Sequence, residues 1–418
     1  MGPTRKLRGL AGVLAPLLLC ACAAVAPSGK QAGATPAPTA SASIRPTPET
    51  DSVDVLLQRM TLRQKVGQLF MVRPDALDPD LSQEEIDDET AAGVCRMTDA
   101  MRQSLEKYPV GGICQFGKNI TDPQQIAAFN GDLQAASALP LLIAVDEEGG
   151  RVARLANNGA FDLPRYESAL SVGETGNPEA ARQMGRTIGA YLRDYGFTMD
   201  FAPVADVWTN PENTVIGDRA FSRDAQTAAA MAGAMAQGLR EEGILPTYKH
   251  FPGHGDTAQD SHDGLASTDR TEDEMRECEW LPFLRATQGA QDDTRAIMVG
   301  HIAAPALGDA GMPASLSHRM VTDILRGQLL VGEDVLVVTD SLAMGAITQQ
   351  YTPAQASVQA LQAGCDILLM PAGLAEAFEG VVAAVEDGTI TETRLDESVR
   401  RILRYKQQYA GLQVAAEQ

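Results

Sequence analysis

Short, continuous apolar runs recur eight times along the chain, and they constrain its fold more than any other feature. The runs do not alternate apolar with polar residues, so strands formed from them would be buried on both faces. Burial on both faces is typical of a parallel sheet covered by helices. The eight predicted strands are Gln68–Val72, Gly111–Phe116, Leu141–Val145, Met199–Val204, Pro246–His250, Ala296–His301, Val335–Thr339 and Asp366–Met370.

Longer amphipathic segments separate these runs, and several carry helix boundaries. Asn177 and Pro178 provide an N-cap and a proline at the first helical position, and Gly196 ends the apolar periodicity that follows. Similar segments, 224–243 and 352–364, also end at a glycine just before a predicted strand. The repeated unit is therefore helix, glycine, strand.

Eight buried strands that alternate with helices predict an α/β fold, a single (β/α)8 TIM-type barrel over residues 51–412, with a short tail at 413–418. A doubly wound open sheet is the alternative. The G-x-G-x-x-G pattern common in that fold does not follow the first predicted strand.

The N-terminal segment has the pattern of an export signal. Residues 1–21 combine a basic start with an apolar run too short to span a bilayer, and we interpret them as a lipoprotein signal peptide. Residues 19–22 resemble the lipobox of bacterial lipoproteins, so Cys22 is the expected lipidation site; an ordinary signal cut at 23–26 stays open. Residues 22–50, rich in Pro, Ala, Ser and Thr, predict a disordered tether. We expect an exported protein, lipid-anchored to the bacterial cell membrane on its extracytoplasmic side.

The chain is strongly acidic, with 34 Lys+Arg against 55 Asp+Glu and a formal net charge of -21. This balance argues against nucleic acid and anionic membrane surfaces as partners, and leaves the lipid anchor as the predicted membrane contact. The sequence does not indicate an oligomeric state.

Four cysteines follow Cys22, at positions 95, 114, 278 and 365, without a C-x-x-C pair, which argues against a zinc cluster. Cys114 and Cys365 lie in apolar runs, where free buried thiols are expected. One disulfide stays open because export permits it.

Polar residues gather where the predicted strands end, which is where a barrel places its chemistry. The segment Asp146–Arg154 follows the third strand, Lys249 and His250 end the fifth, and Asp340 follows the seventh. Their side chains are predicted to meet in one pocket.

Three of the five histidines fall between positions 250 and 262, so a zinc site has to be considered. His250 and His254 are four residues apart, but Pro252 and Gly253 between them prevent the helix that would place both on one face. We expect no metal and no cofactor.

The stretch Lys249–Gly255, followed by Asp260-Ser261-His262, resembles a block of glycoside hydrolase family 3, in the branch of bacterial β-N-acetylglucosaminidases that includes peptidoglycan-recycling enzymes. The resemblance covers residues of about 53 to 410 and implies a (β/α)8 barrel. Further blocks in family order are 61–70, 110–113, 146–154, 201–207 and 338–344.

The resemblance implies three catalytic residues. Asp340 matches the nucleophile, which forms a glycosyl ester. His262 matches the acid/base and Asp260 the partner that orients its ring and favours its charged form. An aspartate that only caps the next helix, or an Asx-turn at Asp260, are the alternatives. Ser341 departs from the family, where a second Asp is common.

The resemblance also implies five residues that hold the terminal sugar: Asp146, Arg154, Arg219, Lys249 and His250. Each of them could instead form a strand-end ion pair. Residues 73–109 match no family block and form either a lid or a surface insertion.

The function implied is a retaining exo-β-N-acetylglucosaminidase that acts on terminal N-acetylglucosamine of peptidoglycan fragments or other glycans. A β-glucosidase, β-xylosidase or glycoside phosphorylase on the same scaffold is the nearest alternative. A lipoprotein that only binds sugar is an alternative of another class.

Overall fold

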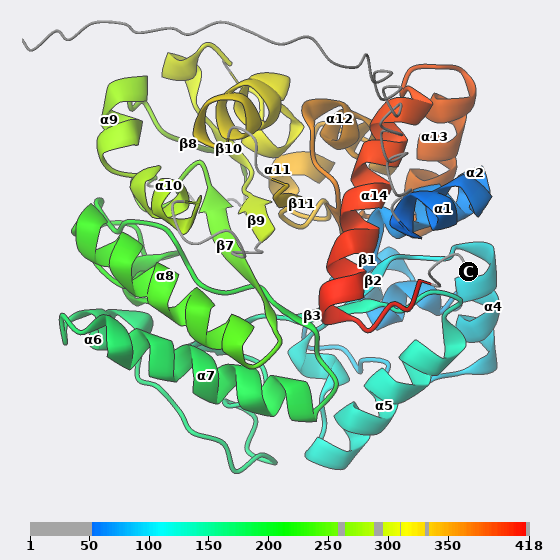
Figure 1. The fold of residues 1–418 in the computed structure, drawn as a ribbon, viewed down its shortest axis with the longest axis horizontal. Helices are drawn as coiled ribbons and strands as arrows, with labels where there is room; N and C mark the ends of the chain where they lie inside the picture. Colours follow the sequence, from blue (N-terminus) through cyan, green and yellow to red (C-terminus); the bar gives the residue numbers. More distant parts are fainter. Residues whose placement is uncertain (1–51, 258–263, 288–295, 310, 331–333, 415–418) are drawn as a thin grey trace, which may run out of the picture. The chain divides into compact units, whose positions relative to one another are not determined.

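Eight parallel strands form one sheet in the computed structural model, which describes residues 52–257, 264–287, 296–309, 311–330 and 334–414 (Figure 1). The strands are β1 Phe70–Val72, β2 Gly112–Gln115, β3 Leu142–Val145, β6 Met199–Asp200, β7 Leu245–Phe251, β9 Ala296–Val299, β11 Leu336–Thr339 and β12 Leu368–Leu369. Each overlaps one of the eight predicted runs.

The sheet closes into a barrel. From β1 to β11, each barrel strand pairs with the next barrel strand, and β1 also pairs with β12, with Phe70 opposite Leu368. A parallel bridge from Val338 to Ile367, the residue before β12, joins the remaining edge. The predicted (β/α)8 barrel is therefore confirmed, and no open edge of this sheet faces solvent.

Helices surround the barrel and supply most of its outer surface (Figure 1). They are α1 Ser52–Arg59, α2 Leu62–Gln68, α3 Gln83–Asp87, α4 Asp99–Lys107, α5 Pro123–Ala136, α6 Ala169–Gly173, α7 Pro178–Asp194, α8 Ala225–Glu241, α9 Glu272–Glu277, α10 Leu281–Thr287, α11 Gly345–Thr348, α12 Pro353–Ala363, α13 Leu374–Glu386 and α14 Glu392–Tyr409. A π-helical segment, Arg319–Leu329, precedes β11.

The helix boundaries expected from sequence are found. The Asn177 side chain accepts a hydrogen bond from the Glu179 backbone N–H at the start of α7, and Gly196 follows its end with a φ of 80°. Gly364 ends α12 with a φ of 117°. Because a side chain disfavours these left-handed conformations, glycine is the residue that stops each helix before its strand.

Two short pairings lie outside the barrel. β4 Glu147–Gly149 and β5 Val152–Ala153 form an antiparallel hairpin just after β3, and β8 Ala266–Ser267 pairs in parallel with β10 Ile302–Ala303. Both follow the C-terminal ends of strands and so border the functional end of the barrel.

The four cysteines of the described residues are free thiols, and Cys114 and Cys365 are buried as expected. Among the described residues, none of the helices is long and apolar enough to cross a membrane. The predicted signal peptide, Cys22, the tether and most of the tail lie outside the described residues and stay predictions.

Candidate functional site

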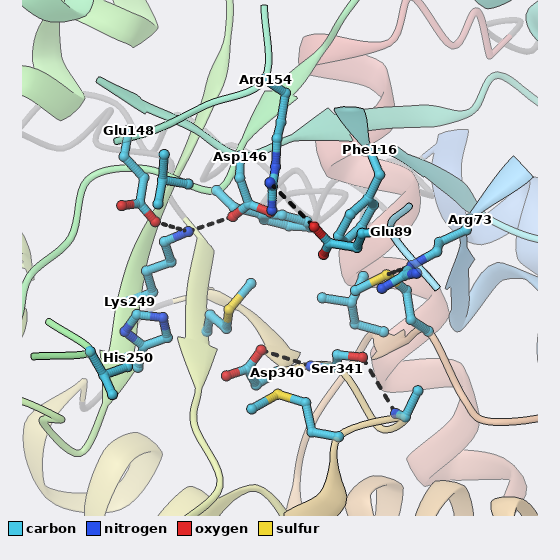
Figure 2. A pocket seen from close by; sticks show the side chains of 18 of the residues that line it. Arg73, Glu89, Phe116, Asp146, Glu148, Arg154, Lys249, His250, Asp340 and Ser341 are labelled. Atoms are coloured by element: carbon cyan, nitrogen blue, oxygen red, sulfur yellow. Dashed lines mark hydrogen bonds and ion pairs between the residues drawn. The ribbon is translucent and has the colours of Figure 1, made fainter. Parts of the chain in front are cut away.

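A cavity of about 360 Å³ opens at the C-terminal ends of the strands, a size suited to a small ligand (Figure 2). Its apolar floor includes Phe201, Met298 and Leu369. Its polar lining residues are Arg73, Asp87, Glu89, Asp146, Glu148, Arg154, Arg219, Lys249, His250, His254, Asp340 and Ser341.

Lys249, at the end of β7, links two carboxylates on one side of the cavity. Its Nζ lies 2.5 Å from Asp146 Oδ1 and 2.6 Å from Glu148 Oε1. Arg219 donates to both carboxylate oxygens of Glu148, from Nε to Oε2 at 2.8 Å and from Nη2 to Oε1 at 2.7 Å. Two cations and two carboxylates thus form one continuous network, which we call the Lys249 network.

Charge pairing outweighs burial in the Lys249 network. Burial alone would raise the pKa of Glu148, but Arg219 and Lys249 hold that pKa well below its usual range. Burial alone would lower the pKa of Lys249, but Asp146 and Glu148 raise it. Both side chains therefore carry their full charge at neutral pH.

Asp206, fully buried after β6, fixes two histidines. Its Oδ2 lies 2.7 Å from His250 Nδ1, and its Oδ1 accepts the His254 backbone N–H at 2.6 Å. Thr257 Oγ1 lies 2.7 Å from His254 Nδ1. Burial, and next the neighbouring His250, lower the pKa of His254, which makes it a neutral ring at pH 7.

Asp340 follows β11 directly and is anchored by its backbone and its side chain. Its N–H donates to Val299 O at 2.8 Å, and its Oδ1 accepts the Ser341 N–H at 2.8 Å. His301 supports this turn from beneath, with Nε2 at 2.8 Å from Ser341 O and Nδ1 at 2.7 Å from Ser315 Oγ. His301 is fully buried, and these contacts give it a structural role.

Two arginines contact the Phe116 ring across the cavity from Asp340 (Figure 2). The Arg73 guanidinium carbon lies 3.9 Å from the ring centroid and that of Arg154 lies 5.2 Å from it. Arg154 Nη1 is also 3.7 Å from Glu89 Oε2. Glu89 belongs to the 73–109 segment, which therefore contributes a wall of the cavity.

The structure brings together Asp340 and all five predicted sugar-binding residues, since each of these six lines the cavity. Arg219, Lys249 and Asp146 are in ion pairs, as the alternative interpretation required, but these pairs face the cavity. The predicted pair Asp260 and His262 lies outside the described residues.

Three residues at the site, Asp206, Glu148 and Glu89, were not assigned from the sequence. Asp206 follows an apolar run, the signal used for the other strand ends, and could have been found in that way. Glu148 lies in the segment Asp146–Arg154, but nothing local separates it from Glu147, which is buried against α7 through Tyr191. Glu89 carries no sequence signal.

The site combines a carboxylate at a strand end with fixed charged donors and acceptors, which suits a polyhydroxylated ligand. Among the residues that the structure describes, no group of three or more His, Cys, Asp or Glu could hold a metal ion.

A family model, "Glycosyl hydrolase family 3 N terminal domain", matches residues 61–405. Beta-hexosaminidase A of Pseudoalteromonas piscicida is 32% identical over 342 residues, which cover 75% of this chain and 56% of that protein. Beta-hexosaminidase LpqI of Mycobacterium tuberculosis is 37% identical over 316 residues, which cover 72% of this chain and 77% of that protein.

Among solved structures, a glycoside hydrolase family 3 beta-N-acetylglucosaminidase from Paenibacillus sp. str. FPU-7 superposes with a TM-score of 0.73 at 36% identity, over 86% of this chain and 65% of that one. The chain thus spans just over half of one curated relative and about two thirds of this structural neighbour.

Proposed function

The chain belongs to glycosyl hydrolase family 3, and we propose that it is a retaining exo-β-N-acetylglucosaminidase that removes terminal β-linked N-acetylglucosamine from peptidoglycan fragments or other glycans. One observation carries the proposal. The Asp340 carboxylate lies at the end of a barrel strand, in the same cavity as the charged groups of the Lys249 network and Arg154. A carboxylate that could act as the nucleophile and charged groups that could bind hydroxyls are thus present together.

In the proposed reaction, an Asp340 carboxylate oxygen attacks the anomeric carbon. The bond to the leaving oxygen breaks as the glycosyl ester forms, and water then hydrolyses that ester, so the configuration is retained. Because the Ser341 N–H and the Val299 carbonyl hold Asp340, the carboxylate needs little reorganisation on attack.

The leaving oxygen needs a proton, and His262 is the proposed donor, with Asp260 as the residue that orients its ring. Both residues lie outside the described residues, so the support for these roles is their place in the family block. The chain bordering that segment is well anchored: Arg270 Nη2 lies 3.0 Å from Asp256 Oδ1, across the gap.

The sugar hydroxyls are proposed to bind to Asp146, Arg154, Arg219, Lys249 and His250. Charged donors and acceptors form strong, directional hydrogen bonds with hydroxyl groups. In the Lys249 network these groups are already aligned and partly desolvated, so a sugar would meet a preorganised surface.

The decisive test is hydrolysis of an aryl β-N-acetylglucosaminide by the wild type and by Asp340→Ala. We expect the variant to lose at least about 10³-fold in kcat, since the covalent step has no substitute. Asp132→Ala, which removes an exposed carboxylate on α5, is the matched control. NMR of the first-formed sugar should show the β anomer. An α product, or an Asp340→Ala enzyme within tenfold of the wild type, would refute the assignment.

The same assay separates the alternatives. A β-glucosidase or β-xylosidase would prefer the corresponding aryl glycoside, and a phosphorylase would release sugar 1-phosphate when phosphate is added. A non-catalytic sugar-binding lipoprotein would bind N-acetylglucosamine in calorimetry and turn over none of these substrates.

Localisation is a separate proposal: the protein is exported and lipid-anchored through Cys22 outside the cytoplasm. Lipid attachment needs the Cys22 thiol, so Cys22→Ser should leave the membrane fraction or stay unprocessed in a bacterial host. Unchanged fractionation would favour an ordinary signal peptide instead.

A further inference from the structure

We propose that Glu89 is a specificity-determining residue: its carboxylate accepts the free 4-hydroxyl of the terminal sugar and closes the cavity to glycans that are extended at that position. Glu89 belongs to the 73–109 segment, whose purpose the family resemblance leaves open. The inference rests on the proposed function, because it needs the anomeric carbon at Asp340.

The shape of a hexose relates Asp340 to the opposite wall of the cavity. C1 and C4 are at opposite ends of a pyranose ring, so a sugar with C1 at Asp340 presents C4 to the opposite wall. Figure 2 shows Arg154 and Glu89 paired with each other on that wall, and Asp340 on the other side of the cavity. A substituent on the 4-hydroxyl would run into this pair.

The Arg154–Glu89 pair is loose enough to admit a hydroxyl group. Arg154 Nη1 and Glu89 Oε2 are 3.7 Å apart, beyond hydrogen-bond distance. Arg154 Nε is buried and has no hydrogen-bond partner among the described residues. A sugar hydroxyl between the two side chains would donate to Glu89 and accept from Arg154, which improves the bonding of all three groups.

Glu89 is held in place by a buried anchor. Lys118, only 2% exposed, donates to the carbonyl oxygens of Glu85, Ile86 and Asp88 at 2.8, 2.8 and 3.1 Å. Since Lys118 follows β2, it fastens the end of α3 to the barrel just before Glu89. The wall is therefore part of the rigid scaffold, as a specificity-determining residue requires.

Glu89 itself contributes little to folding. Its side chain is 54% exposed, and partly exposed ion pairs add little stability. Substitution of Glu89 should therefore leave the barrel intact, and changes in the enzyme can be assigned to the wall of the cavity.

The test compares p-nitrophenyl β-N-acetylglucosaminide with its 4-O-methyl derivative. The wild type should strongly prefer the parent compound. Glu89→Ala should lower kcat/KM for the parent about tenfold, because a charge-assisted hydrogen bond is lost. The 4-O-methyl substrate should lose nothing or gain, so the ratio of the two kcat/KM values should move at least tenfold toward it. Glu89→Gln, which keeps the bulk, should move the ratio less.

If Glu89 had a purely structural role, Glu89→Ala would lower kcat/KM for both substrates by the same factor. An unchanged ratio of the two kcat/KM values in Glu89→Ala would therefore overturn the inference. Glu84→Ala, which removes an exposed carboxylate from α3 outside the cavity, should change neither substrate. Calorimetry of N-acetylglucosamine and its 4-O-methyl derivative gives the same ratio without turnover. If the wild type binds N-acetylglucosamine in preference to its 4-O-methyl derivative but hydrolyses neither substrate, the proposed function alone is refuted. If the wild type hydrolyses both substrates without preferring the parent compound, the role of Glu89 alone is refuted.

Discussion

The Lys249 ammonium and the Glu148 carboxylate are 2.6 Å apart, each with 2% of its side chain exposed, and they join β7 to the hairpin that follows β3. Because both charges are shielded from water, neither can lose its partner without a large cost. The ion pair makes the wall of the cavity rigid, and both of its members line the cavity in which the sugar is proposed to bind.

Replacing Lys249 should therefore damage stability and activity together. Lys249→Met leaves Glu148 with Arg219 alone and Asp146 without its ammonium partner, and should cost about 3 kcal/mol in the free energy of unfolding. It should also lower kcat/KM about 10²-fold through lost hydroxyl binding. Urea unfolding and steady-state kinetics check both. Lys65→Met, which breaks a pair with Asp396 away from the cavity, is the control. Wild-type kcat/KM in Lys249→Met would contradict the sugar-binding role.

The ion pair between Lys249 and Glu148 should stabilise the protein at intermediate pH and lose its contribution at both low and high pH. The pKa of Glu148 is lowered in the folded state, so its contribution is present above its unfolded value of about 4.3 and is lost as pH falls further. The pKa of Lys249 is raised, so its contribution is present below about 10.4 and is lost above it. The difference in unfolding free energy between wild type and Lys249→Met should be constant from about pH 5 to 9.

The proposed roles of His262 and Asp260 can be tested by changing the leaving group. If His262 donates the proton, its loss matters little for dinitrophenol, a stable anion, and much for a sugar alkoxide. General acid catalysis is worth about 10²- to 10⁴-fold, so His262→Ala should show that bias and Asp260→Ala a smaller one. Single-turnover rates with a disaccharide and a dinitrophenyl glycoside check it. Equal losses would direct attention to Asp263 or to a carboxyl group of 73–109.

The buried side chain of Lys406, which does not line the cavity, should make the free energy of unfolding depend on pH. Burial lowers the pKa of Lys406 to about 7, and Nζ donates to Gln68 Oε1 at 2.5 Å. Between about pH 7 and 10.4 the unfolded chain binds a proton that the folded chain lacks, so stability should rise with pH by up to about 1.4 kcal/mol per unit.

Lys406→Met should remove this slope and stabilise the protein most at pH 6 and below, where the cost of burial is fully present. Urea unfolding at pH 6, 8 and 9.5 measures it, with Lys65→Met as the control. An identical pH profile in Lys406→Met and the wild type would show that Lys406 does not titrate in this range.

Substitution of Asp366 should change the stability of the protein but not its catalysis. It precedes β12, at the N-terminal end of the barrel, and accepts from Arg326 and Arg401 at 2.6 Å each. Burial alone would raise its pKa, but these arginines hold it at about 2. Asp366→Asn should cost about 3 kcal/mol at pH 7, a difference that shrinks as pH falls below about 4. Activity per folded molecule should stay unchanged; a large loss of kcat would contradict this separation.

The fold could be predicted because its signals are local. A buried parallel strand needs an unbroken apolar run, and a helix that stops before a strand needs a residue such as Gly196 or Gly364 that tolerates positive φ. Strand lengths were less predictable. β6 covers only Met199–Asp200 of the predicted run 199–204, because hydrogen bonds to neighbours, and not residue type, decide where a strand ends.

The site could be predicted only where a polar residue follows a predicted strand, as Asp340 follows β11. The partners that give these residues their electrostatics come from other segments. Asp206 reaches His250 from the loop after β6, and Glu89 reaches Arg154 from a segment without periodicity. Such pairings depend on tertiary placement, which the sequence alone does not carry.

The buried thiols give the barrel two internal reporters. Cys114 in β2 and Cys365 before β12 are fully buried, and burial raises the pKa of both, that of Cys365 to about 12. Neither can be alkylated until its surroundings open. β1 lies between β2 and β12, so the two labelling rates report local opening of the barrel on either side of β1. Equal rates would mean that the ring opens only as a whole, and unequal rates would locate the side that opens first.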